Sequence, residues 1–131
     1  MTTGRETGLQ RWLDFAERKD RSELLALVAD RAVFRSPAVH APQPGRELVV
    51  GYLSAAMVVL GPTLRYHRTW QRDTGAVLEF TATVGDREVQ GVDIIEWDEA
   101  GLIVDFTVMI RPLSGLNAVI TEMAAQLSPP T

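Results

Sequence analysis

Asp93 is the residue of this chain whose position most clearly suggests chemistry. It lies in the apolar run GVDIIEW at residues 91–97, directly before the turn DEAG at residues 98–101. An acid in the middle of a strand either faces water or lies in an apolar site, where its charged form is costly and its pKa rises. We interpret Asp93 as a cavity acid that is at least partly protonated at neutral pH. The alternative is a strand acid that faces water or pairs with an arginine such as Arg68 or Arg111.

Two other side chains that could transfer protons lie before and within the loop near residue 40. His40 lies between Val39 and Ala41, four residues after Ser36. It is either an exposed loop residue or a base at a cavity mouth. Ser36 is either a turn residue before proline or part of a site, and its hydroxyl is no general base near pH 7 without an adjacent base.

The strand around residues 64–70 contains two more candidates. Strand alternation places Tyr66 and Trp70 on the inner side and His67 on the outer side. Arg68 shares the inner parity, so it either pairs with Asp93 or a ligand carboxylate, or extends its charged end to the surface.

Composition limits the classes of function. The chain has 131 residues, which predicts one domain over residues 1–131 with frayed ends at about 1–6 and 128–131. A net charge of −4 without a basic stripe argues against nucleic acid. No 18-residue apolar span or basic-then-apolar leader is present, so we expect a cytoplasmic protein without a membrane partner. There is no cysteine and there are only two histidines, so we expect no metal, no cofactor and no thiol chemistry.

The first half of the chain has helical periodicity. Apolar residues between Leu9 and Ala16 predict a first helix, and a second short helix is expected from Ser22 through Ala29. Arg31 to Arg35 reads as a short strand that ends at Ser36-Pro37. A third helix is expected from Arg46 to Leu60, ended by Gly61-Pro62.

The second half alternates with a period of two. Strands are expected over residues 63–72, 76–84, 88–97 and 102–111, joined by short turns, and an amphipathic helix over Leu113 to Leu127 follows. In the strand that contains Asp93, Val89, Gly91, Ile95 and Trp97 share its side. Helices followed by a long curved antiparallel sheet predict an α+β domain.

The order of elements, with several strings, resembles the NTF2-like superfamily. These strings are QRW at residues 10–12, LVADRAVFRSP at 27–37, PG at 44–45, VD at 92–93 and WDEAGLIV at 97–104. The superfamily includes SnoaL-like polyketide cyclases, limonene epoxide hydrolase, scytalone dehydratase and ketosteroid isomerase. The resemblance implies a cystatin-like, cone-shaped α+β barrel, with helices on a strongly curved, mostly antiparallel sheet around an internal cavity. It also implies a homodimer formed through the outer sheet face.

Matching this chain to ketosteroid isomerase gives one agreement and two departures. Asp93 falls where that family keeps a protonated aspartic acid as an oxyanion donor. Trp12 stands at the position of the tyrosine donor, and Ser36 at that of the aspartate that carries the proton, which makes ordinary ketosteroid isomerisation doubtful. For limonene epoxide hydrolase, the catalytic arginine and aspartate positions fall on Phe80, Ala82 and Arg111.

Two classes of function follow from these comparisons. One is a cofactor-independent isomerase, cyclase or lyase that acts on a small hydrophobic carbonyl compound, with Asp93 as acid or oxyanion donor and His40 or Ser36 as its polar partner. The other is a non-catalytic ligand-binding domain or a domain with a vestigial cavity. In either case the expected ligand-lining residues are Trp12, Phe34, Tyr52, Met57, Tyr66, Arg68, Phe80, Phe106 and Val108. Core packing explains six of them equally well, namely Phe34, Tyr52, Met57, Phe80, Phe106 and Val108.

Overall fold

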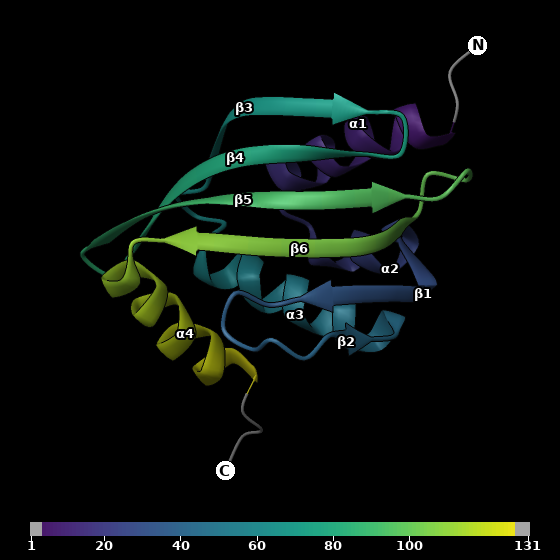
Figure 1. Ribbon diagram of the computed structural model, residues 1–131. Helices are drawn as coiled ribbons and strands as arrows, with labels where there is room; N and C mark the ends of the chain where they lie inside the picture. Colours follow the sequence, from purple (N-terminus) through teal and green to yellow (C-terminus); the bar gives the residue numbers. More distant parts are fainter. Residues whose placement is uncertain (1–3, 128–131) are drawn as a thin grey trace.

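Six strands form one curved, open sheet that helices cover on a single face (Figure 1). This is a computed structural model, and it describes residues 4–127. The strand order is β2-β1-β6-β5-β4-β3, so β2 and β3 are the sheet edges. The strands are β1 (Val28–Arg35), β2 (Gln43–Pro44), β3 (Arg65–Arg72), β4 (Gly75–Val84), β5 (Arg87–Trp97) and β6 (Ile103–Arg111). The expected α+β architecture, with helices on a curved and mostly antiparallel sheet, is confirmed.

Helices pack against the concave face of this sheet. They are α1 (Gly4–Arg18), α2 (Leu24–Leu27), α3 (Arg46–Val59) and α4 (Leu113–Leu127), with a 3-10 turn over Arg21–Glu23 before α2. The expected frayed ends lie partly outside the described residues, at 1–3 and 128–131, whereas residues 4–6 belong to α1. No helix in the described range is long and apolar enough to cross a membrane.

The long strands β4, β5 and β6 form the antiparallel centre of the sheet. Short turns join them, and Gly85 and Gly101 occupy the left-handed backbone region at φ +62° and +82°, which glycine adopts without steric cost. The inner positions of β5 are all buried, namely Val89, Gly91, Asp93, Ile95 and Trp97. The expected side of Asp93 in β5 is therefore confirmed.

The second helix is shorter than the sequence pattern predicts. It ends at Leu27, and Val28 and Ala29 belong to β1, not to a helix through Ala29. Val28 pairs with Ile103 in the parallel ladder between β1 and β6, and its side chain is fully buried. Strand pairing and burial therefore override the local helical spacing, and the sheet is mixed.

An irregularity in β3 changes which side chains face inward. The β3–β4 register shifts between Tyr66 and Thr69, as a β-bulge does, so the alternation does not continue through the strand. Tyr66 pairs with Phe80 and points inward, whereas Trp70 pairs with Val77 and is 52% exposed. The predicted inward orientation of Trp70 and Arg68 is wrong, because the extra residue reverses their parity.

Candidate functional site

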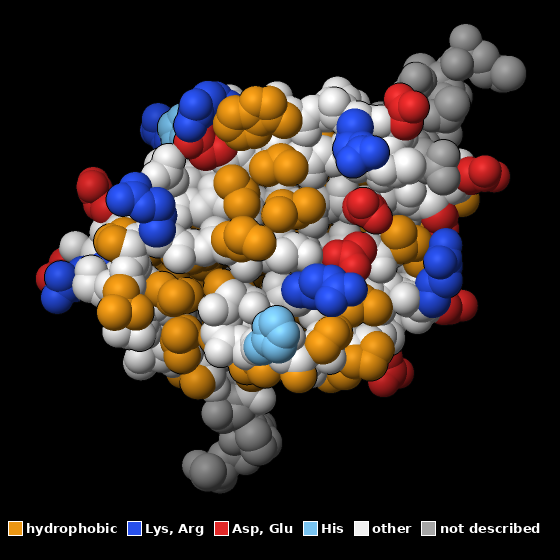
Figure 2. All heavy atoms as spheres, viewed as in Figure 1, with side chains coloured by type: hydrophobic (Ala, Val, Ile, Leu, Met, Phe, Trp, Pro, Cys, Tyr) orange, Lys and Arg blue, Asp and Glu red, His pale blue; other side chains and the backbone are white. Residues whose placement is uncertain are grey.

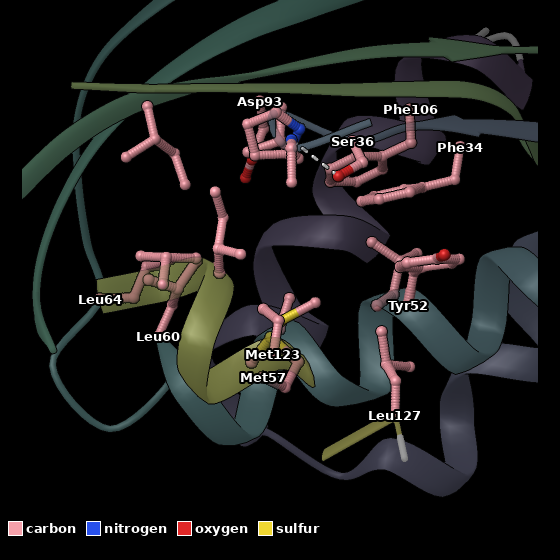
Figure 3. A pocket seen from close by; sticks show the side chains of 18 of the residues that line it. Phe34, Ser36, Tyr52, Met57, Leu60, Leu64, Asp93, Phe106, Met123 and Leu127 are labelled. Carbon is pink, nitrogen blue, oxygen red and sulfur yellow. Dashed lines mark hydrogen bonds between the residues drawn. The ribbon is translucent and has the colours of Figure 1, made fainter. Parts of the chain in front are cut away.

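A cavity of about 210 Å³ opens between the concave sheet face, helices α3 and α4, and the loop after β1. Its walls are almost entirely aliphatic and aromatic. In Figure 3, Asp93 projects from the sheet toward a space bounded by α3 and α4 side chains, among them Met57, Leu60 and Met123. Residues expected to contact a ligand that do line this cavity are Trp12, Phe34, Ser36, Tyr52, Met57, Tyr66, Asp93, Phe106 and Val108.

Asp93 is held by a chain of hydrogen bonds from two aromatic side chains. The Tyr66 hydroxyl donates to Asp93 Oδ2 at 2.5 Å, and the Trp12 indole nitrogen donates to the Tyr66 hydroxyl oxygen at 3.0 Å. These side chains come from β5, β3 and α1, which lie far apart in the sequence. Neither Arg68 nor Arg111 takes part in these hydrogen bonds. The alternative of an ion pair between Asp93 and one of these arginines is therefore wrong.

Burial sets the electrostatics of this group. Asp93 is 6% exposed, and removal from water raises its pKa from 3.8 to about 7, while the hydrogen bond from Tyr66 acts in the opposite direction. Burial, and next the nearby carboxyl, raise the pKa of Tyr66 well above its usual value, so the phenol keeps its proton at physiological pH. The site therefore has one titratable group in the neutral range.

Phe80 in β4 packs against Tyr66, and Gly91 in β5 leaves room for the Phe80 ring. Phe80 stands edge-on to Tyr66, with ring centroids 6.5 Å apart and planes at 86°. Phe80 in turn lies directly over Gly91, where an added Cβ would be 2.6 Å from the Phe80 ring. Phe80 is thus absent from the cavity lining, contrary to expectation, because its ring fills the space above Gly91 and supports Tyr66.

Arg68 does not reach the cavity. Its guanidinium makes two 2.7 Å hydrogen bonds with the Glu79 carboxylate on the outer sheet face, and it lies 5.1 Å from the Trp70 ring centroid. Uninterrupted alternation in β3 does not predict this Arg68–Glu79 pair, because the register shift between Tyr66 and Thr69 turns Arg68 to the outer face. The outward orientation predicted for His67 agrees with its 2.7 Å contact to Thr81.

Of the two candidate proton-transfer residues between β1 and α3, one lines the cavity and the other does not. Ser36 lines the cavity, and its hydroxyl oxygen accepts a 3.0 Å hydrogen bond from the Ala38 backbone. His40 is exposed and is not part of the cavity lining. Within the described residues, no lysine, arginine, histidine or glutamate lines the cavity, so Asp93 is its only group that titrates near neutral pH.

The hydrogen bonds from Trp12 through Tyr66 to Asp93 were not predicted. Sequence alternation placed Tyr66 on the same concave face as Asp93, which was the available signal. No local pattern links either residue to the first helix. Across residues 4–127, no cluster of three or more histidine, cysteine or acidic side chains could hold a metal ion.

Comparison with known proteins places these features in a family context. The SnoaL-like domain family matches residues 9–106. A Pseudomonas aeruginosa structure described as a steroid delta-isomerase is 39% identical, with a TM-score of 0.91 over 97% of this chain and 93% of that one. A Silicibacter pomeroyi protein with a cystatin-like fold is 31% identical, with a TM-score of 0.83 over 91% of this chain and 84% of that one. No curated protein matches the chain.

Proposed function

The chain belongs to the SnoaL-like domain family, and from that premise we propose that it binds a small, largely apolar carbonyl compound whose oxygen accepts a hydrogen bond from Asp93. The observation that carries this proposal is a neutralisable acid with a free oxygen at the wall of an apolar cavity. Tyr66 occupies Asp93 Oδ2, and no protein donor in the described residues bonds to Oδ1.

The dimensions and charge of the cavity support this class of ligand. An engineered apolar cavity of about 150 Å³ binds benzene, so a cavity of about 210 Å³ with an open mouth suits a small aromatic or alicyclic body. No cationic side chain lines the cavity in the described part of the chain, so an anionic ligand would find no counter-ion there and would be repelled by ionised Asp93.

The same hydrogen bond would assist chemistry next to the carbonyl group. When a proton leaves the carbon beside a carbonyl, negative charge moves to the oxygen, and a preorganised donor stabilises that charge. Asp93 would act as this donor in an isomerase, cyclase or lyase reaction. The Pseudomonas aeruginosa relative carries the name of an isomerase, which makes this reaction class the first candidate.

A non-catalytic binding role is the second candidate, and one observation favours it. Proton abstraction requires a second group near the ligand, and the described lining offers only Ser36 and tyrosine hydroxyls besides Asp93. His40, which could supply a base, is exposed outside the lining. The two candidates therefore differ in whether a bound ketone loses a proton.

Hydrogen–deuterium exchange at the carbon beside the carbonyl separates these candidates. Methyl naphthyl ketone is incubated with the protein in D₂O, and mass spectrometry follows its deuterium content while calorimetry measures its binding. An enzyme accelerates exchange, by about 10²-fold or more over buffer, and Asp93→Leu, which removes the donor, abolishes the acceleration. Binding without accelerated exchange supports the non-catalytic candidate, and no binding refutes the proposed function.

We also propose that the outer sheet face forms a homodimer. An outer apolar patch consisting of Trp70, Val77, Val92, Ile94 and Met109 lies on this face, with Trp70 and Met109 52% and 56% exposed. Figure 2 shows apolar side chains gathered over the sheet between groups of opposite charge. The ion pairs Arg68–Glu79 and Arg35–Asp105 give this face both signs of charge, which a second copy related by a two-fold axis can complement.

Sedimentation velocity of two charge variants tests the dimer. Met109→Lys places a charge in the outer apolar patch and is expected to convert a dimer into a monomer. Leu113→Lys is the matched control, since Leu113 is 72% exposed on α4, outside the patch. A monomeric wild type at micromolar concentration, or equal behaviour of both variants, contradicts this interface.

A further inference from the structure

The hydrogen bonds that end at Asp93 run in one direction. An indole nitrogen donates and cannot accept, so the Tyr66 oxygen must be the acceptor of the 3.0 Å bond from Trp12. The Tyr66 hydroxyl has a single proton, and Asp93 Oδ2, at 2.5 Å, is the acceptor that the structure places in reach of it. Both protons of this chain of hydrogen bonds therefore point toward Oδ2.

The other carboxyl oxygen, Oδ1, is left for the cavity. No donor from the described residues bonds to it, and none of their buried side-chain oxygen or nitrogen atoms lacks a partner. Oδ1 is therefore not sealed within the protein, and Asp93 is part of the cavity lining. When the acid is neutral, its proton belongs on the oxygen that does not already accept the Tyr66 proton.

We propose that Trp12 and Tyr66 are positioning residues that keep the acid proton of Asp93 on Oδ1, so that the neutral site selects a ligand acceptor over the matching donor. This inference rests on the proposed function and deepens it by naming the residues that fix the direction of the Asp93 proton and the ligand preference that results. If Trp12 did not occupy the Tyr66 oxygen, that oxygen would be free to accept the acid proton, which would then turn away from the ligand.

The selectivity follows from what each ligand would leave unpaired. A ketone oxygen accepts from Oδ1 and leaves no donor unsatisfied. An alcohol of the same shape can also accept that bond, but Oδ1 of the neutral acid then offers no acceptor for the alcohol's own hydroxyl proton, which should weaken binding about tenfold. Once Asp93 ionises, Oδ1 accepts and no longer donates, so the ketone loses its partner and the alcohol gains one.

Among the described groups around Asp93, Asp93 itself sets how the preference between ketone and alcohol changes with pH. The strand neighbours across the ladders are Leu78 in β4 and Val108 in β6, and α4 presents apolar side chains to the cavity. Tyr66 and Tyr52 are the remaining titratable groups in the described lining. Charged side chains of these strands have their partners on the outer face: Arg68 pairs with Glu79, Arg111 donates to Gln90, and Asp105 pairs with Arg35.

A matched pair of probes tests the inference on the full-length protein. Calorimetry compares methyl naphthyl ketone with the alcohol formed by reducing it, at about pH 5 and about pH 9, on either side of the Asp93 titration. At the lower pH, we expect the ketone to bind about tenfold more tightly than the alcohol. At the higher pH, we expect the alcohol to bind more tightly than the ketone. Infrared spectroscopy should show the ketone C=O stretch at lower frequency in the low-pH complex than in buffer.

Variants separate positioning from simple packing. Trp12→Phe keeps a ring beside Phe15 and Phe106 but removes the N–H, so the low-pH ketone preference should fall to about twofold or less. Trp70→Phe, on the outer face, makes the same chemical change and should leave the preference intact. Tyr66→Phe should move the pH of reversal upward, because the Tyr66 hydrogen bond lowers the pKa of Asp93.

Asp93→Asn provides a test that does not depend on the stability of Trp12→Phe. The asparagine carbonyl can accept from Tyr66 while its NH₂ group faces the cavity, which reproduces the neutral acid at every pH. This variant should keep the ketone preference at both pH values. Equal binding of both probes by the wild type at both pH values, or an unchanged preference in Trp12→Phe, overturns the inference while the proposed function stands. A wild type that binds neither probe refutes the proposed function itself.

Discussion

Asp93 and Glu79 lie on neighbouring strands, and both are almost completely covered, at 6% and 7% exposure. Glu79 pairs with Val92 across the β4–β5 ladder, so it belongs to the outer face, whereas Asp93 belongs to the cavity face. The hydrogen bond from Arg68 is the main cause that lowers the pKa of Glu79 to about 2. Removal from water raises the pKa of Asp93 to about 7.

The difference between these two carboxyls shows that low exposure alone does not set the charge of an acid: the guanidinium partner keeps Glu79 ionised on the outer face, whereas deep burial raises the pKa of Asp93. Glu79 receives two hydrogen bonds from a guanidinium and one from Gln90, all of which favour the carboxylate. Asp93 receives one hydrogen bond from a neutral phenol and otherwise faces apolar walls. The outer acid is therefore a structural ion-pair member, and the inner acid can change its protonation near neutral pH.

The largest expected effect concerns the pH dependence of stability. Between about pH 4 and pH 7, native Asp93 keeps a proton that the unfolded chain has lost, so the free energy of unfolding falls as pH rises through this window. The difference between a pKa of 3.8 and one of about 7 corresponds to about 4 kcal/mol.

Asp93→Asn should remove this dependence, because asparagine does not titrate. Urea unfolding at several pH values measures the free energy of wild type and variant. The free energy of unfolding of the wild type minus that of the variant should decrease as pH rises and then level off above about pH 7. Parallel curves would mean that Asp93 has an ordinary pKa and that the contrast with Glu79 does not exist.

An intermediate effect is expected from Tyr66→Phe. The change removes a buried hydrogen bond and leaves the Trp12 N–H without its partner, which should cost about 1–3 kcal/mol of stability. It should also raise the pKa of Asp93 above about 7, since the lost bond favoured the carboxylate. Carboxyl NMR titration measures the pKa and urea unfolding the stability.

Tyr52→Phe is the matched control for this prediction. It removes the same hydroxyl from another wall of the cavity, and no hydrogen bond joins Tyr52 to Asp93 in the structure. The pKa of Asp93 in Tyr52→Phe should therefore equal that of the wild type. An equal displacement of the pKa in both variants would indicate a general change of the cavity and not the loss of one hydrogen bond.

The smallest effect is expected on the outer face. Arg68→Met removes the main partner of Glu79, so the pKa of Glu79 should rise from about 2 toward its usual value of 4.5. A lowered pKa contributes stability above about pH 4.5 that is lost as pH falls toward 2, and the variant should lack this acid-dependent part. Carboxyl NMR measures the titration. Arg87→Met is the control, because Arg87 is exposed and its side chain pairs with the exposed Asp86 at 3.8 Å, not with Glu79.

Much of the fold follows from local pattern. The period-two alternation of β4 and β5 identified their buried sides, including that of Asp93, and α4 begins and ends as its apolar spacing predicts. The pattern failed at Val28 and Ala29, where helical spacing continues but parallel pairing with β6 makes a strand. A parallel partner about 75 residues away leaves no mark in a local period.

For the site, the sequence by itself determined that an acid stands on the concave side of an apolar strand. Tertiary structure decided what that acid touches. Tyr66 and Trp12 reach Asp93 from β3 and α1, and the bulge in β3 turns Arg68 away to Glu79. Alternation is a property of neighbouring residues, whereas these contacts depend on sheet curvature, register and the packing of a helix across the sheet. The direction of the Asp93 proton, and with it the proposed ligand preference, therefore exists only in the folded chain.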